Sequence, residues 1–483
     1  MSRDLPARPS LDHLKKQAKD LVRGGAATRL ADAQRLVARE YGFPSWTKLK
    51  RHVLSLAADP ADALAAALNG NDAQAVRRVL KAHPELGGRL NEPLPGADFG
   101  ALPLHQAVRS RNREIIDLLL ALGADINGKS RWWAGGFGLL ETADAEVVPF
   151  LLERGITMTI HGAARLGRLA DVDRLVRDDS AAVHARGGDG QTPLHVASTV
   201  EIARALVEHG ADVDALDVDH ESTPAQYAVR ERQDVARFLV SAGCRADILL
   251  AAALGDEPRV RALLDADPSS AETSVSADYF PMANPRAGGT IYIWTLGGNK
   301  TAHVVAREFG HQRVLELLMR RTRDALRLAL ACETGDRATF DAILAARPDV
   351  AATLTVAEAR RLPAAAEANN AGAVRLMLEA GWPVNALAGG ASALHWAGFH
   401  GNAGMARAIL RHSPSLELED AKFHGRPLGW ALHGSLNGWH RDRGDYPATV
   451  AALLDAGATM PTTNRLEASE PVRDLLRRRG LLG

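Results

Sequence analysis

One stretch of the sequence decides the fold: Gln191-Thr192-Pro193-Leu194-His195-Val196-Ala197. Thr192 can cap a helix with its hydroxyl, and Pro193 suits the first turn, where its missing N–H breaks no hydrogen bond. Leu194 and Ala197 can then pack inward on one face of that helix. The stretch therefore predicts a short helix with a defined start and one buried face.

A second, Leu-rich helix follows such a stretch and ends in a glycine turn. Clear copies of this second half are Ile115-Ile116-Asp117-Leu118-Leu119-Leu120-Ala121-Leu122-Gly123-Ala124-Asp125, Ala205-Leu206-Val207-Glu208-His209-Gly210-Ala211-Asp212 and Leu453-Leu454-Asp455-Ala456-Gly457-Ala458. The two halves recur with a period of roughly 30–35 residues, which is typical of helical solenoids. One helical hairpin cannot bury its apolar face alone, so each unit is expected to stack on its neighbours.

Copies of the first stretch identify the type of repeat. They are Leu102-Pro103-Leu104-His105-Gln106-Ala107, Thr223-Pro224-Ala225-Gln226-Tyr227-Ala228, Ser392-Ala393-Leu394-His395-Trp396-Ala397 and Arg426-Pro427-Leu428-Gly429-Trp430-Ala431. These stretches resemble the Thr-Pro-Leu-His-x-Ala signature of ankyrin repeats, and the resemblance covers roughly residues 60–483. It implies an all-α, ankyrin-like solenoid of about twelve helix-turn-helix repeats. The signature histidine ties neighbouring turns by hydrogen bonds, so His105, His195 and His395 are interpreted as structural.

The chain is predicted to divide into five segments. They are an N-terminal helical cap (1–58), ankyrin-like repeats (59–271), a finger insertion (272–299), further repeats (300–460) and a C-terminal capping helix (461–483). Within the insertion, Thr290-Ile291-Tyr292-Ile293-Trp294 has the residues most typical of a strand, and a Gly-Gly turn precedes it. The insertion is therefore predicted to form a β-hairpin-like projection.

Composition narrows the class of function. The formal net charge is zero, although residues 1–56 carry 12 Lys+Arg against 5 Asp+Glu. A basic helix-turn-helix in the cap is the only feature that suggests contact with nucleic acid. The rest of the chain has no excess of Lys and Arg, so nucleic acid is not an expected partner. The two cysteines form no disulfide framework or Cys-based zinc site, and neither a signal peptide nor a membrane-spanning run is visible. We expect a cytoplasmic protein that needs no cofactor and has no metal site of recognisable spacing.

Function is expected where the repeat pattern breaks. The predicted partner- or ligand-binding residues lie in the segment after Ser130, in the insertion, and in the crowded C-terminal units. They are Arg131, Trp132, Trp133, Tyr279, Phe280, Arg286, Tyr292, Trp294, Lys300, Trp396, Trp430 and Trp439. Aromatic side chains would supply buried area, and the cations Arg131, Arg286 and Lys300 would form a rim.

Two functions remain open. The resemblance implies a binding or scaffold protein that recognises an unidentified partner protein through its concave face and extended fingers. The alternative is an enzyme or small-molecule binder whose groove in the C-terminal half is lined by tryptophans and histidines, with His303, His395, His400 and His433 as the candidate catalytic residues. No fixed catalytic or metal-binding spacing supports that alternative, so an enzyme is the less favoured reading.

Overall fold

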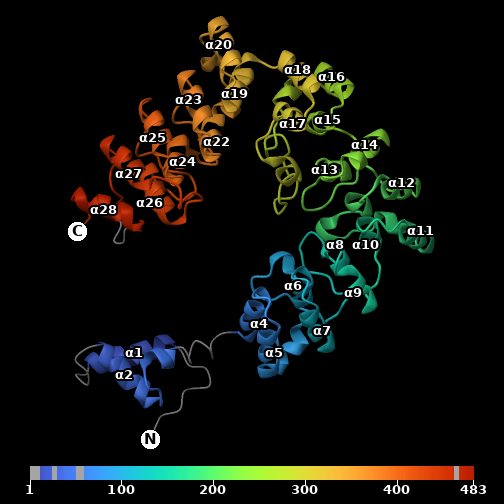
Figure 1. The fold of residues 1–483 in the computed structure, drawn as a ribbon, viewed down its shortest axis with the longest axis vertical. Coiled ribbons are helices and arrows are strands. Elements are labelled where there is room, and N and C mark those ends of the chain that lie inside the picture. Colours follow the sequence, from blue (N-terminus) through green and yellow to red (C-terminus); the bar gives the residue numbers. More distant parts are fainter. Residues whose placement is uncertain (1–10, 24–29, 51–58, 462–466, 483) are drawn as a thin grey trace. The chain divides into compact units, whose positions relative to one another are not determined.

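The computed structural model describes residues 11–23, 30–50, 59–461 and 467–482 (Figure 1). The chain is all-α, and its helices follow one another in twos along the sequence. The first seven pairs are α4 (Pro60–Asn69) with α5 (Ala73–Ala82), α6 (Pro103–Arg109) with α7 (Arg113–Ala121), α8 (Leu139–Thr142) with α9 (Val148–Glu153), α10 (Ile160–Arg165) with α11 (Leu169–Asp178), η5 (Pro193–Val196) with α12 (Val200–Glu208), α13 (Pro224–Ala228) with α14 (Gln233–Ser241), and α15 (Ile248–Leu254) with α16 (Glu257–Ala266).

Five more pairs complete the array. They are α17 (Ala302–Glu308) with α18 (Gln312–Arg321), α19 (Asp324–Thr334) with α20 (Arg337–Ala346), α22 (Arg361–Glu367) with α23 (Ala371–Glu379), α24 (Ala393–Phe399) with α25 (Ala403–Leu410), and α26 (Pro427–Asn437) with α27 (Tyr446–Asp455). Twelve pairs in the described residues confirm the predicted solenoid of about twelve repeats.

Shorter helical segments connect the pairs. They are η1 (Pro84–Arg89), η2 (Asp98–Gly100), η3 (Ser180–His184), η4 (Gly188–Gly190), η6 (Pro268–Glu272), η7 (Ile293–Gly297), η8 (Val350–Thr353) and α21 (Val356–Ala359). A last helix, α28 (Glu470–Arg478), packs on α27 and ends where Gly480 takes a positive φ of 68°. The described strands are β1 (Leu387–Ala388) and β2 (Ala391–Ser392), which pair antiparallel across Gly389-Gly390.

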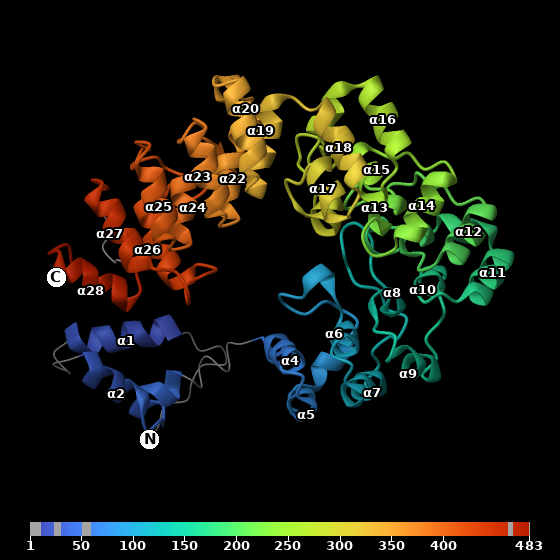
Figure 2. The ribbon, with the colours of Figure 1, turned by 45° about the horizontal axis from the view of Figure 1, so that its top comes forward.

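The described residues form two compact units. The first unit runs to Arg259 and also includes Thr273–His311, and the second comprises Val260–Glu272 and the chain from Gln312 onward. In the second unit, α24 packs between α22 and α26, while α25 packs between α23 and α27 (Figures 1 and 2). In the first unit, η5 packs between α10 and α13, and α15 packs on α17.

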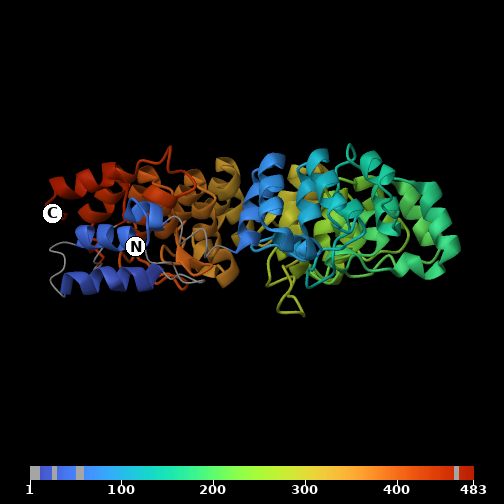
Figure 3. The same cartoon turned by 90° about the horizontal axis from the view of Figure 1, so that it is seen from below.

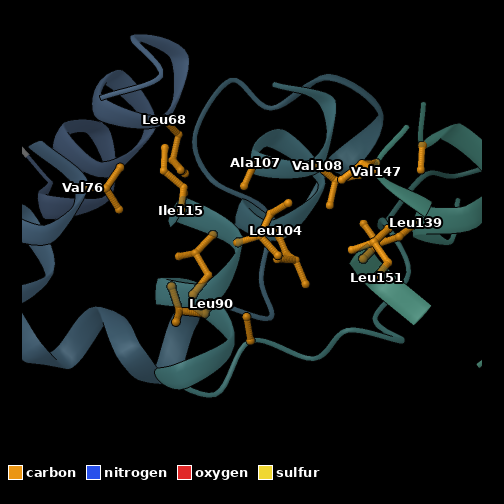
Figure 4. Close-up of a cluster of buried hydrophobic side chains, with 14 of the residues drawn as sticks. Leu68, Val76, Leu90, Leu104, Ala107, Val108, Ile115, Leu139, Val147 and Leu151 are labelled. Carbon is orange, nitrogen blue, oxygen red and sulfur yellow. The ribbon is translucent and has the colours of Figure 1, made fainter. Parts of the chain in front are cut away.

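The first pairs show how sequence patterning becomes a core. Leu104, Val108 and Ile115 meet Leu139 and Leu151 of the next pair in one apolar cluster (Figure 4). Each such leucine contributes about 1.5–3 kcal/mol by leaving water, so no pair is expected to be stable without its neighbours.

The signature histidines hold successive repeats together, as predicted. His195 Nδ1 lies 2.9 Å from Thr192 Oγ1 and accepts a hydrogen bond from the Thr192 N–H, while Nε2 donates to Ser222 O of the next repeat. His395 makes the same set of contacts with Ser392 and Gly425 O. His105 Nε2 donates to Phe137 O. These rings are buried, and burial lowers the pKa of His195 to about 3.

The N-terminal segment contains two helices that pack on each other, α1 (Leu11–Arg23) and α2 (Leu30–Glu40). Tyr41 and Gln17 exchange hydrogen bonds between them. A third helix starts at Trp46, and Ser45 caps it through a hydrogen bond from the Lys48 N–H. Residues 51–58 lie outside the described residues.

The insertion differs from its prediction. The ends of the insertion do pair, because Val275 N donates to Lys300 O and Asn299 N donates to Val275 O. An antiparallel bridge also joins Ser274 and Thr301. The predicted strand Thr290–Trp294 is wrong, because the segment forms a turn and then enters the helical segment η7 at Ile293. In Figure 3 the insertion projects as a yellow-green loop to one side of the helices of the first unit.

Candidate functional site

Each finger is the loop that joins the second helix of one pair to the first helix of the next pair. Two consecutive fingers of the first unit, residues 179–192 and 209–223, are joined through their backbones, because Val218 N and Asp219 N both donate to Asp189 O. Asp189 takes a positive φ of 54° in the tight turn η4. A Cβ at Gly188 would lie 2.0 Å from the Phe137 ring, and one at Gly190 would lie 2.3 Å from Val218. Glycine therefore permits this close approach.

Asp189, Asp219 and His220 meet where these two fingers join. One donor atom from each of the three side chains lies within 4.8 Å of the other two, and His220 Nε2 is 3.7 Å from Asp219 Oδ2. All three residues are buried, and Asp189 Oδ1 has no hydrogen-bond partner among the described residues. Burial, together with the charges of Asp219 and Asp217, raises the pKa of Asp189 to about 6 against the opposing effects of the His220 charge and a hydrogen bond from Trp132. The fingers thus concentrate negative charge in a buried place.

Asp217 lies next to this group but has a different role. Its Oδ1 accepts a hydrogen bond from the Ser222 N–H, and its Oδ2 accepts from the His220 N–H and the Tyr227 hydroxyl. These bonds shape the finger from 217 to 222, because they satisfy backbone donors that the turn would otherwise leave unpaired. Asp217 therefore serves the fold of the finger.

The adjacent tryptophans lie beside the same group. Trp132 packs edge-on against Phe99 at 4.9 Å between ring centroids, and Trp133 lies 6.2 Å from Trp132. Arg286 of the insertion lies over Trp133, with its guanidinium carbon 4.6 Å from the ring centroid. Both tryptophans are half-buried. Two separate breaks in the repeat pattern thus meet in space.

The insertion is tied to the finger from 209 to 223. Glu221 accepts hydrogen bonds from the Ala283 and Asn284 N–H groups, each 2.8 Å long. Ser222 Oγ accepts from the Ile291 N–H, and His220 Nδ1 lies 2.8 Å from Gly289 O. These contacts hold Trp294 over His220, with 4.7 Å between ring centroids, and leave it 59% exposed.

The other predicted residues of the insertion have mixed surroundings. Tyr292 is fully buried, and its hydroxyl donates to Asp247 Oδ2, so it belongs to the core and offers no surface to a partner. Phe280 packs edge-on against Tyr292, while Tyr279 is exposed. Lys300 pairs with Glu308 at 2.7 Å. Arg131 donates through its guanidinium to Asn91 O.

We call the side chains gathered around these fingers the fingertip cluster. Its members are Trp132, Trp133, Asp189, Asp219, His220, Arg286 and Trp294.

A second group, the C-terminal cluster, lies on α24, α26 and the loop that follows α26. Its members are Trp396, Phe399, His400, Trp430, His433 and Trp439. Trp396 is at its centre, with ring centroids 5.1 Å from Trp430, 5.6 Å from Trp439 and 5.9 Å from His400. Trp430 donates its indole N–H to Asp420 Oδ2. The structure therefore brings together all of the predicted C-terminal residues.

The four histidines that the enzyme hypothesis names as candidate catalytic residues have different environments. His400 is buried, stacks on Trp396 and lies with Nε2 2.8 Å from Glu367 O. His433 is exposed and lies against Phe399. Burial lowers the pKa of His395 and of His400, so both rings are neutral near pH 7. His303 is buried and belongs to the first unit.

Sequence reasoning missed Asp189, Asp219 and His220. The two aspartates are 30 residues apart, while equivalent residues of these repeats such as His195 and Gln226 are 31 apart, so Asp189 aligns with His220 and Asp219 lies one position before it. This spacing of nearly one repeat is the sequence signal that could have indicated that the two aspartates lie close together. No short motif could reveal the group, because its members come from two fingers.

No helix among the described residues is both long enough and apolar enough to cross a membrane.

Comparison with known proteins agrees with the repeat architecture. Residues 160–249 match a family model described as ankyrin repeats (3 copies), and residues 99–128 match one for a single ankyrin repeat. The ankyrin repeat protein FPV230 of Fowlpox virus (strain NVSL) is 30% identical over 140 residues, which are 26% of this chain and 74% of that protein.

Two further matches are more limited. The serine/threonine-protein kinase VIK of Arabidopsis thaliana is 38% identical over 77 residues, which are 15% of this chain and 18% of the kinase. The crystal structure of the human ASB11 ankyrin repeat domain aligns over 63% of this chain and 100% of that domain, with 17% identity and a TM-score of 0.27. The family assignment rests on the repeat models and on the viral relative: the chain belongs to the ankyrin repeat family.

Proposed function

We propose that the chain is a binding protein that recognises a partner protein through the fingertip cluster and the exposed apolar side chains around it. Ankyrin repeats typically mediate protein–protein interaction, and the fingers are where this chain departs most from a plain repeat. The observation that carries the proposal is a concentration of exposed large apolar side chains on the fingers and insertion of the first unit. They are Phe99, Leu216, Val218, Tyr279, Ile293 and Trp294.

The anchoring of this surface supports the proposal. Exposed aromatic side chains on a mobile loop would lose conformational entropy on binding, which weakens association. Trp294 is instead held against His220, and the loop that carries it is fixed by Glu221 and Ser222. Tryptophan and arginine are the residue types that contribute most to protein interfaces, and Arg286 lies beside Trp133 in this cluster. A partner segment with apolar side chains fits such a surface.

Site-specific photocrosslinking tests the proposal. A photoreactive amino acid is placed at position 294 or, as a matched control, at position 439 of the C-terminal cluster, where Trp439 is 64% exposed. Both full-length variants are expressed in the native cells and irradiated. We expect a discrete crosslinked protein from position 294 that position 439 does not give. Equal crosslinking to the same proteins from both positions, or none from position 294, would contradict the proposal.

Small-molecule binding at the C-terminal cluster is the second candidate. The supporting observation is that Trp396 Nε1 and His400 Nδ1 are buried and lack hydrogen-bond partners among the described residues, although they belong to the same aromatic group. Both nitrogens are closed to solvent, so a flat ligand with polar edges would pair with them after a neighbouring ring moves aside. Native mass spectrometry of the purified protein tests this idea, because a bound molecule that is lost in Trp396→Phe would support it. A mass equal to that of the bare chain would count against it.

A further inference from the structure

We propose that Asp189, Asp219 and His220 form a binding site for a divalent transition-metal ion of the zinc class, with water completing the coordination. The site would join two consecutive fingers of the first unit. This inference is independent of the proposed protein partner, since it rests on donor atoms within one chain. The mixed oxygen and nitrogen donor set suits zinc, whereas magnesium and calcium prefer oxygen donors alone.

The state of His220 is the first argument. Gly289 O can only accept a hydrogen bond, so His220 Nδ1, 2.8 Å away, carries the proton. This leaves Nε2 as the ring nitrogen that faces Asp219 Oδ2, 3.7 Å away. Tetrahedral zinc separates its ligand atoms by about 3.4 Å, close to this spacing.

The carboxylate of Asp189 is the second and independent argument. The residue is 9% exposed, and its Oδ1 has no hydrogen bond of normal geometry in the described part of the chain, although the Trp132 indole is close enough to lower its pKa. A buried carboxylate without a partner is costly, and proteins usually pair it or use it to bind a metal. The described residues give Asp189 no lysine or arginine partner. A bound cation would balance this charge together with that of Asp219.

The surroundings hold the donors in place. The Gly288 N–H donates to Asp219 Oδ1, which leaves Oδ2 directed to His220. Asp189 is fixed by its turn and by the two backbone hydrogen bonds that its carbonyl accepts. The hydrogen bond from His220 Nδ1 to a carbonyl sets the ring orientation, as is common for metal-binding histidines. Asp217 is committed to backbone donors and to Tyr227, so it is not a ligand.

A metal at this position would stabilise the fingertip cluster. His220 supports Trp294, and Asp219 accepts from Gly288 of the insertion. Fixing both side chains to one ion would therefore fix the insertion against the finger from 209 to 223. The expected effects are metal-dependent thermal stability and slower hydrogen exchange in residues 283–294.

Calorimetric titration of the chelator-treated full-length protein with Zn²⁺ tests the proposal. We expect one saturable site per chain. The variants Asp189→Asn, Asp219→Asn and His220→Gln should each bind Zn²⁺ at least about tenfold more weakly. The control Asp98→Asn removes the same charge from an exposed position of the same unit and should bind like the wild type. The absence of a saturable site, or unchanged affinity in Asp189→Asn, would overturn the proposal.

Absorption spectra of the Co²⁺-loaded protein locate the ion independently. Oxygen and nitrogen ligands from these three residues give visible bands without a thiolate charge-transfer band, and we expect those bands to disappear in Asp189→Asn. A thiolate band would place the metal at Cys244 or Cys332 and overturn the assignment. Asp189→Asn keeps the shape of the side chain and removes buried charge, so it is the variant to trust if His220→Gln fails to fold.

Discussion

The fingertip cluster and the C-terminal cluster both combine tryptophan with histidine, yet the two clusters differ in the charged groups among their members. In the C-terminal cluster the aromatic rings pack on one another, and His400 and Trp430 find a backbone carbonyl and a carboxylate as partners. In the fingertip cluster two carboxylates and one imidazole converge within 4.8 Å of one another. Aromatic and histidine content alone therefore does not distinguish a packed helix face from a binding site. The convergence of charged side chains does.

Acidification should produce the largest effect, because it acts on the buried imidazoles that join the repeats. His195 is fully buried with a pKa of about 3, while the unfolded value is 6.5. As the pH falls from 6.5 toward 3 the unfolded chain takes up this proton and the folded chain does not, so the folded state loses stability, on the order of 4 kcal/mol. The contribution of His195 to the free energy of unfolding is therefore fully present above pH 6.5.

Chemical denaturation at several pH values, read by hydrogen exchange in α12 and α13, checks this effect. His195→Gln copies Gln226, which accepts from the Thr223 N–H at the equivalent position of the next repeat. This variant should be less stable at pH 7 but lose less stability on acidification. An identical pH profile in the variant would show that His195 is not the group responsible.

Replacing Trp396 by alanine should break the C-terminal cluster. Its ring contacts Phe399, His400, Trp430 and Trp439, so the substitution leaves a cavity and removes four aromatic contacts. We expect the second unit to lose about 3 kcal/mol of unfolding free energy. Hydrogen exchange in α24 and α26 measures the loss, and α13 serves as the internal control. A loss below about 1 kcal/mol would mean that these rings form a preformed ligand surface with little structural role.

Replacing Asp189 by asparagine should increase the free energy of unfolding. The substitution removes a charge that burial and Asp219 destabilise, so the metal-free protein should become more stable by about 1 kcal/mol. Thermal unfolding with and without Zn²⁺ provides the measurement. Zn²⁺ should raise the melting temperature of the wild type and leave that of Asp189→Asn unchanged. Destabilisation of the metal-free variant would argue that Asp189 has an unrecognised structural partner.

Replacing Trp294 by alanine should change stability least. The side chain is 59% exposed and rests mainly on His220, so we expect a loss of less than about 1 kcal/mol. The same substitution should markedly reduce the yield of the partner in pull-down. A large loss of stability would instead assign Trp294 to the packing of the insertion.

Much of the fold could be predicted from the sequence, because each repeat carries its own start, stop and period. Thr192, His195 and Gly210 are local signals, and their meaning does not depend on distant contacts. The segment Thr290–Trp294 was mispredicted for the opposite reason. Its β-branched and aromatic residues favour a strand, but its tertiary contacts decide otherwise, since Tyr292 reaches Asp247 and the Ile291 N–H reaches Ser222 Oγ.

The candidate site was only partly predictable. Trp132, Trp133 and Trp294 stand out in a chain with few aromatic residues, so they could be selected individually. Their meeting around Asp189 and His220 depends on how two fingers and an insertion pack, which no local pattern encodes. The C-terminal histidines are predicted as candidate catalytic residues only because several lie close together in the sequence. His395 and His400 instead form hydrogen bonds with backbone carbonyls.

The central claim is that the fingertip cluster, and not the C-terminal cluster, binds the partner. Its most direct test is the affinity of the partner identified by crosslinking for two matched full-length variants, Trp294→Ala and Trp439→Ala, whose side chains are 59% and 64% exposed. We predict that calorimetry finds binding at least about tenfold weaker for Trp294→Ala, as for an interface anchor, and within twofold of wild type for Trp439→Ala. The reverse order, or equal losses in both variants, would contradict the claim.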